Sequence, residues 1–252
     1  MRKLLFALLA LAVSPALAED NLKLSANDLS ARTVLSFKVA DAVAQKLLPA
    51  GWELNSPTAG PTKGFNLGIT LIDYLMVQDP EGKASPQYST IAMNIPAKKT
   101  ATGETANMVF GGFIAPGGAP GPYSVFGPAN ITIDRSVHTD PDGKSIIKES
   151  WQAKAEDGNA LDVQLEFVRG VPARGKAEAK IRSAAKPDFY RVYRFEQAAD
   201  VARSTATGVD RVVKFSFKAS GPKLAPIFDG GEQLIGITSV PSYTRSIYLQ
   251  AL

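Results

Sequence analysis

Cysteine is absent from the 252 residues of this chain, and histidine occurs only once, as His138. The lack of cysteine excludes thiolate nucleophiles, iron–sulfur clusters, cysteine-based zinc sites and structural disulfides. One imidazole is too few for a histidine-rich metal site, so we predict no metal site and no cofactor. The fold must therefore rest on its own apolar core, which a chain of this length supplies as one large domain or two small ones.

Sequence motifs of the common catalytic and nucleotide-binding sites are also missing. Gly143-Lys144-Ser145 resembles the end of a phosphate-binding loop, but His138 stands where such a loop needs its first glycine. The glycine-rich segment 111–122 is followed by a strand pattern rather than by a helix. No Gly-x-Ser-x-Gly motif occurs, and His138 lies near Asp140 in a predicted turn, where an exposed imidazole is commoner than a catalytic one. The sequence therefore does not favour a serine hydrolase or a dinucleotide-binding enzyme.

The first 18 residues have the three parts of a secretory signal peptide. Arg2 and Lys3 form a basic start, Leu4–Val13 an apolar run, and Ala16-Leu17-Ala18 a small-residue cleavage site. The apolar run is too short to span a bilayer, and no later segment has the apolar length that a membrane span needs. We therefore expect a soluble protein that begins at Glu19 and is periplasmic or secreted.

The charge of the expected mature chain is nearly balanced. Removal of Arg2 and Lys3 leaves a formal charge of +2, and the one dense basic stretch runs from Arg169 to Arg194. This stretch carries no nucleic-acid-binding motif, so we interpret it as a solvated face or a weak contact with an anionic surface. We predict no nucleic-acid partner, and the sequence leaves the formation of homo-oligomers open.

One short helix is well signalled. It is predicted from about Ala40 to Leu48, with Asp41 near its positive end, Lys46 near its negative end and Pro49-Ala50-Gly51 to stop it. A second helical turn or two is suggested at Gln197–Ser204 by a run of alanine and aspartate.

Elsewhere, apolar residues alternate with period two, which is typical of strands. The alternating sets are Leu67, Ile69, Leu71, Leu75 and Val77; Ile91, Met93 and Ile95; Leu161, Val163, Leu165 and Phe167; and Val213, Phe215 and Phe217. Turn formers separate the strands at 79–82, 140–143 and 157–158, which favours antiparallel neighbours. About ten to twelve strands are too many for one strongly twisted open sheet. We predict a mainly β fold (β or α+β), with residues 19–252 forming a single antiparallel β-barrel or closed two-sheet sandwich.

Three charged residues interrupt the apolar alternation at positions that should face inward. They are Asp73 between Leu71 and Leu75, Arg135 between Ile133 and Val137, and Arg191 between Phe189 and Tyr193. A buried charge must pair, neutralise or line a wet cavity. One interpretation is that bulges or strand ends turn these residues outward. The other is that they line a central cavity, where an arginine could bind the carboxylate of a small ligand.

From Phe37 onward, a series of short motifs is similar to the acetoacetate decarboxylase-like superfamily. The motifs are Phe37-Lys38-Val39, Leu48-Pro49-Ala50-Gly51, Tyr88 to Pro96, and Pro122-Tyr123-Ser124-Val125-Phe126-Gly127-Pro128-Ala129. The order of the expected helix, strands and loops is similar over most of the expected mature chain, and the motifs themselves are short. The resemblance implies an antiparallel barrel with a central cavity, a fold used by small-molecule enzymes and their relatives.

The resemblance does not extend to the residues of imine-forming decarboxylation. The family's decarboxylases carry a lysine pair just after the phenylalanine, glycine and proline of the last motif, where this chain has Ala129 and Asn130. The family's acidic residue on the preceding strand corresponds to Thr90. Lys98 and Lys99 form the only adjacent lysine pair after residue 18, and they open a polar loop in which solvation is expected.

These observations favour an exported, soluble β-barrel protein that binds a small, partly apolar ligand in a central cavity, with an anionic group if the arginines face inward. Asp73, Arg135 and Arg191 are the candidate ligand-binding residues, and no catalytic residue is assigned. The alternatives are a lyase or decarboxylase that uses Lys98 or Lys99, and a structural or partner-binding module whose interior is filled by side chains.

Overall fold

The computed structural model describes residues 21–250, so the predicted signal sequence 1–18 lies outside the described residues. Strands dominate: β1 (Leu22–Lys38), β2 (Trp52–Leu54), β3 (Leu67–Gln78), β4 (Tyr88–Lys99), β5 (Thr105–Ile114), β6 (Gly127–Thr139), β7 (Ser145–Ala155), β8 (Ala160–Val168), β9 (Ala173–Ser183), β10 (Tyr190–Ser204), β11 (Val209–Asp210), β12 (Val212–Ser220) and β13 (Gln233–Gln250). Helix α1 (Asp41–Lys46) and a 3₁₀ turn η2 (Pro116–Gly118) complete the elements. The prediction of a mainly β fold is confirmed.

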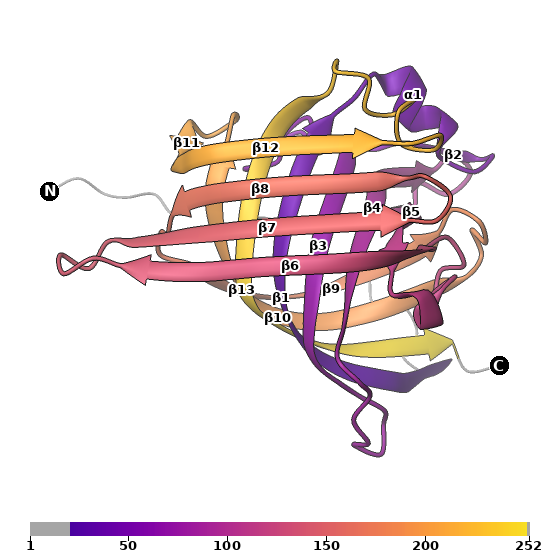
Figure 1. The fold of residues 1–252 in the computed structure, drawn as a ribbon. Coiled ribbons are helices and arrows are strands. Elements are labelled where there is room, and N and C mark those ends of the chain that lie inside the picture. The colour runs from indigo at the N-terminus through magenta and orange to yellow at the C-terminus, as the bar shows by residue number, and fades with distance from the viewer. Residues whose placement is uncertain (1–20, 251–252) are drawn as a thin grey trace, which may run out of the picture.

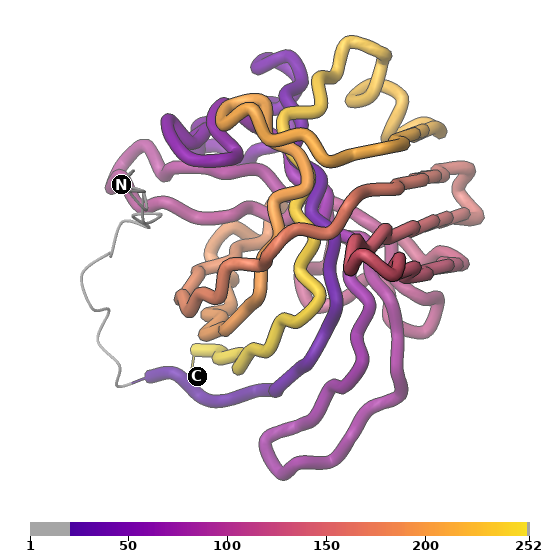
Figure 2. The backbone as a smooth tube through the Cα atoms, turned by 90° about the vertical axis from the view of Figure 1, so that its left-hand side faces the viewer, coloured from indigo at the N-terminus to yellow at the C-terminus, as the bar shows by residue number. Residues whose placement is uncertain are grey.

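Seven strands close into a barrel. Their order around the ring is β1-β3-β4-β5-β9-β10-β13, with β13 returning to β1 (Figures 1 and 2). All neighbours in this ring are antiparallel except β5 and β9. These two strands run parallel, and the only residues that pair between them are Asn107–Val109 of β5 with Ile181–Ser183 of β9. The closure therefore depends on a short seam, while the long β1–β13 pairing joins the two ends of the described chain.

Strands β6, β7, β8 and β12 form a second sheet, called here the outer sheet. It is joined to the barrel where β5 and β6 pair in parallel at Phe113–Ile114 and Gly127–Pro128. Figure 1 shows its strands crossing in front of β1, β3 and β4. The largest apolar core of the molecule lies between this sheet and the outside of the barrel.

The alternation of β3 and β4 explains why the barrel wall has two different faces. The residues that the sequence marks as apolar stripes point toward the outer sheet and are almost completely buried: Leu67, Ile69, Leu71, Ile91, Met93 and Ile95. The intervening residues Gly68, Thr70 and Ile72 point into the barrel, because successive side chains of a strand face opposite sides. From Leu67 to Leu71 and from Ile91 to Ile95, the sequence stripes therefore mark the outside of the barrel wall. A register shift at Leu75 ends this alternation, so Leu75 is exposed and Val77 lines the barrel interior.

The local predictions have different outcomes. The short helix is present as Asp41–Lys46, and the hairpin at Asp157-Gly158 joins β7 to β8 as expected. The predicted helical turn at Gln197–Ser204 is wrong, because these residues belong to β10 and pair with β13. Pairing with a neighbouring strand outweighs the weak helix preference of a few alanines. Within residues 21–250, no helix has the length and apolar character that would let it cross a membrane.

Trp151 tests the core between the outer sheet and the barrel. Its side chain is fully buried on β7, so we expect Trp151→Ala to lower the free energy of unfolding by about 3–5 kcal/mol. Lys154→Ala changes an exposed residue of the same strand that faces away from the barrel, and should stay within about 0.5 kcal/mol. Urea unfolding followed by circular dichroism measures both values. Equal stability of the two variants would contradict the placement of the main core outside the barrel.

Candidate functional site

The inside of the barrel holds a cavity of about 430 Å³, which is in the size range of small-molecule sites. All seven barrel strands and the loop between β5 and β6 contribute to its lining. Five of the seven tyrosines of the chain line it: Tyr74, Tyr88, Tyr123, Tyr193 and Tyr243. Such residues combine a large apolar surface with a polar tip, so they suit a site for a partly apolar ligand.

The loop that follows β5 covers part of the cavity. Gly121 has a positive φ of 69°, and a Cβ at this position would lie 2.5 Å from the Phe126 ring, so only glycine fits there. This tight turn directs Tyr123 into the barrel, where its hydroxyl is hydrogen-bonded to that of Tyr193. Ser183 Oγ donates a 2.6 Å hydrogen bond to the Tyr123 carbonyl and thus attaches the loop to β9.

One carboxylate and two guanidinium groups form the polar centre of the cavity. Asp28 on β1 is only 3% exposed and accepts a hydrogen bond from Nε of Arg245 on β13. Arg245 also donates to the Tyr74 hydroxyl at 2.9 Å, and its guanidinium carbon lies 4.1 Å from the centroid of the Tyr193 ring. These contacts hold Arg245 in one orientation.

Arg32 shares the same carboxylate but is bound less completely. Its Nη2 atom lies 3.5 Å from Oδ1 of Asp28, which is an ion-pair contact without a hydrogen bond. Its Nε donates to Ser30 Oγ at 2.9 Å, and its guanidinium carbon lies 3.5 Å from the centroid of the Tyr243 ring. The side chain is thus held in place while Nη2 keeps its capacity to donate.

A third guanidinium, that of Arg191 on β10, lines the cavity beside Tyr123. Its guanidinium carbon lies 5.9 Å from the centroid of that ring, and among residues 21–250 it has no carboxylate partner. The buried Nε of Arg191 and the buried Oγ1 of Thr90 make no hydrogen bond. Buried polar atoms nearly always have hydrogen-bond partners in native proteins. These two donors have none within the protein, so they are available to a ligand.

The tyrosines do not compensate the excess of positive charge. Burial raises the pKa of Tyr88, Tyr123 and Tyr243, which keeps these hydroxyls neutral at neutral pH. Burial, followed by the charge of Arg245, lowers the pKa of Arg32, but a guanidinium stays protonated in proteins. Three guanidiniums against one carboxylate leave the cavity with a formal charge of +2.

The structure separates the three residues that the sequence analysis grouped together. Arg191 lines the cavity, whereas Asp73 and Arg135 lie outside it, between the barrel wall and the outer sheet. Their Oδ2 and Nη1 atoms are 3.5 Å apart, and Arg135 also donates to Glu149 at 3.1 Å. Asp73 shares the parity of Leu71, and this parity faces the outer sheet, so the same alternation that buries Leu71 keeps Asp73 out of the barrel.

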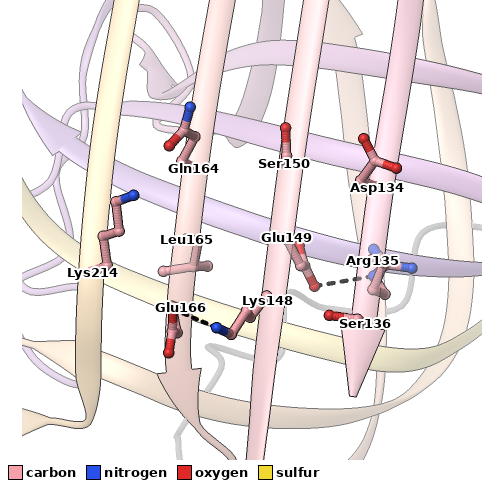
Figure 3. Close-up of a pocket in the computed structure, with 10 residues that line it drawn as sticks. All are labelled: Asp134, Arg135, Ser136, Lys148, Glu149, Ser150, Gln164, Leu165, Glu166 and Lys214. Carbon is pink, nitrogen blue, oxygen red and sulfur yellow. Dashed lines mark hydrogen bonds and ion pairs between the residues drawn. The ribbon is translucent and has the colours of Figure 1, made fainter. Parts of the chain in front are cut away.

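A second depression, on the outer sheet, is an open groove of about 490 Å³. Figure 3 shows its lining, and its residues are Asp134, Arg135, Ser136, Lys148, Glu149, Ser150, Gln164, Leu165, Glu166 and Lys214. Its buried acid is already paired with Arg135, and Lys148 lies 3.3 Å from Glu166. The buried charge of this groove is satisfied, and the groove is more open to solvent than the barrel cavity. The barrel cavity is therefore the candidate site.

The lysines considered for catalysis lie elsewhere. Lys98 is 42% exposed at the end of β4 and pairs with Glu53 of β2 at 2.8 Å. Neither Lys98 nor Lys99 lines the cavity, and the lining found within residues 21–250 contains no lysine at all. Of the positions matched to the superfamily, Thr90 does line the cavity, while Ala129 belongs to the core against the outer sheet and Asn130 is exposed.

Sequence reasoning missed Asp28, Arg32 and Arg245. A signal exists in β1, because Asp28, Ser30 and Arg32 share one parity and leave a polar stripe along the strand. Nothing in the sequence pattern pairs this stripe with Arg245, which lies 217 residues away from Asp28.

The shared carboxylate leads to a stability prediction. Asp28→Asn removes the only acidic partner that two buried guanidiniums have among residues 21–250, so we expect the free energy of unfolding to fall by about 3–5 kcal/mol. Asp157→Asn, which alters an exposed pair with Lys223, is the control and should leave stability nearly unchanged. Urea unfolding at pH 7 measures both variants. A loss of less than about 1 kcal/mol in Asp28→Asn would mean that Asp28 does not hold the two arginines.

No protein-family model matches this sequence, and no curated protein matches it. Solved structures do resemble it, and two of them are enzymes. One is the enduracididine biosynthesis enzyme MppR, with a TM-score of 0.54 at 10% identity over 88% of this chain and 87% of MppR. The other is an acetoacetate decarboxylase-like enzyme from Sphingomonas wittichii RW1, with a TM-score of 0.52 at 13% identity over 96% of this chain and 98% of that one. The protein thus has the acetoacetate decarboxylase-like fold, as its motifs between Phe37 and Ala129 predicted.

Proposed function

We propose that this protein binds a small, partly apolar organic anion inside the barrel and holds it by a carboxylate group. The observation that carries this proposal is the surplus of guanidinium groups in the cavity. Arg32, Arg191 and Arg245 face a single acid, Asp28, and two of the three arginines keep a buried nitrogen without a hydrogen-bond partner. A buried positive charge is costly unless it is compensated, and a carboxylate is a group that guanidinium binds especially well.

The rest of the lining suits an apolar body attached to that carboxylate. Aliphatic and aromatic side chains make up much of the cavity wall, including Ile72, Val109, Ile114 and Phe126. Thr90 supplies a buried hydroxyl without a partner, which can donate to a carbonyl or carboxylate oxygen. Small-molecule sites are usually lined by many apolar groups and a few polar ones, as this cavity is.

The structural neighbours support this function in general terms. MppR was solved in complex with the condensation product of pyruvate and imidazole 4-carboxaldehyde, a small organic molecule. Because a fold does not determine chemistry, the proposal for this chain concerns binding and rests on its own cavity residues. It needs neither a nucleophile nor a metal.

We also propose that the protein acts outside the cytoplasm, in the periplasm or after secretion. The basic, apolar and small-residue parts of residues 1–18 support this location. A ligand-binding barrel in that compartment would encounter small molecules before they enter the cell.

Ligand binding is tested by filling the cavity. Thr70 and Ala92 face each other across β3 and β4 and both line the cavity, so Ala92→Phe or Thr70→Phe should occlude it. Isothermal titration at pH 7 with butyrate, pyruvate, benzoate and adipate should detect at least one complex, weakened about tenfold or more in these variants. Lys98→Phe places the same ring on β4 outside the cavity and is the matched control. The proposal fails if no acid binds, or if the cavity variants bind as well as the control.

Export is tested separately. The full chain, expressed in a bacterium with two membranes, should be recovered in the osmotic-shock fraction with the mass of residues 19–252, because a signal peptidase removes residues 1–18. Leu8→Arg breaks the apolar run and should keep the uncleaved chain in the cytoplasm. A wild-type chain that stays intact in the cytoplasm would contradict the proposed location.

A further inference from the structure

The two incompletely paired guanidiniums lie in different parts of the cavity. Arg32 is on β1 and Arg191 on β10, and β13 runs between these strands. Along β13, Arg32 is opposite Val240, whereas Val192, the neighbour of Arg191, is opposite Tyr248. Eight residues of strand correspond to roughly 25 Å of backbone.

The reach of the Arg32 side chain shortens this separation without removing it. Arg32 contacts Asp28, which is opposite Arg245 on β13, so its guanidinium extends over about half of the interval. On the order of 10 Å of strand still remains toward the backbone of Arg191, and the direction of the Arg191 side chain decides how much of it separates the two guanidiniums.

The contacts of the two arginines assign them to separate groups. Arg32 is held by Ser30 and lies over Tyr243, while Arg191 lies beside Tyr123. Arg245 lies over Tyr193, whose hydroxyl is hydrogen-bonded to that of Tyr123, so these side chains form the link from one arginine to the other. The cavity therefore has a positive group toward each end of a row of aromatic side chains.

The charge of the lining indicates how many negative groups a ligand brings. Asp28 contacts both Arg245 and Arg32, and its single negative charge neutralises one of their two positive charges. Arg191 has no acidic partner among residues 21–250. The remaining formal charge of +2 is balanced by a dianion and only half balanced by a monoanion. Two separate positive groups favour a dianion whose two negative charges are far apart.

From this arrangement, which rests on the proposed function, we infer that the ligand is an elongated dicarboxylate. One carboxylate binds Nη2 of Arg32, the other binds the guanidinium of Arg191, and an apolar middle lies along the tyrosines and aliphatic residues between them. Arg245 keeps its bonds to Asp28 and Tyr74 and acts as a positioning residue for Arg32 through the shared carboxylate.

A chain-length series tests this inference. The α,ω-dicarboxylates from succinate to sebacate, each beside its own monomethyl ester, are titrated into the purified protein by calorimetry at pH 7. Affinity should pass through a maximum at one length, where the diacid binds about tenfold or more tightly than its ester, because only the diacid engages both arginines. Very short diacids should gain little over their esters.

Variants assign the two ends. Arg191→Met and Arg32→Met should each abolish the advantage of the diacid over its ester, since one guanidinium remains. Arg32→Met should still fold, because Asp28 and Arg245 remain as a matched pair, and thermal melting checks this. If the Arg32→Met variant does not fold, the Arg191→Met variant alone tests the inference. Arg194→Met, on the outward face of β10 where Arg194 pairs with Glu178, is the control and should keep the advantage.

The outcomes separate this inference from the proposed function. If acids bind but every ester binds as tightly as its diacid, the cavity takes monocarboxylates and the inference is overturned. Loss of diacid and ester binding alike in Arg191→Met would place both arginines on one carboxylate, which also overturns it. If neither acids nor esters bind, the proposed function fails together with the inference.

Discussion

The packing of the outer sheet against the barrel is the interaction on which the rest of this structure depends. Large apolar residues on the outside of the barrel wall, such as Ile69 on β3 and Ile91 on β4, need a partner layer, and the outer sheet with Trp151 provides it. Because this core lies outside the barrel, the barrel does not have to fill its own interior to be stable. The interior is thereby free to hold polar groups and a cavity.

The charged groups inside the barrel depend on that freedom. Asp28, Arg32 and Arg245 come from the first and last strands, and the β1–β13 pairing brings them together. Such a cluster costs stability, since each buried charge loses its hydration and one carboxylate is shared by two guanidiniums. A protein selected for stability alone would gain from apolar residues at these positions. Their presence, together with Arg191, is the basis of our proposal that the cavity binds a negatively charged ligand.

The likeness to MppR and to the Sphingomonas enzyme concerns the fold, not the chemistry inside the barrel. The cavity lining found within residues 21–250 has arginines and tyrosines but no lysine, and Lys98 is paired with Glu53 at the surface. The same architecture can present different side chains from its inward positions, because alternate residues of each strand can change without disturbing the outer core.

The sequence by itself determined the mainly β character, the helix at Asp41–Lys46, the β7–β8 hairpin and the likeness in fold, because period-two alternation and turn residues are local signals. It also singled out Arg191, whose parity matches that of Tyr193 on the same strand. Only the tertiary structure decided which face of each strand lines the cavity. An apolar stripe looks the same whether it faces a barrel interior or a second sheet, so Asp73 and Arg135 were grouped with Arg191 although they lie outside the barrel. The grouping of Asp28 with Arg245 likewise needed the closed barrel, since no local pattern connects residues from the two ends of the chain.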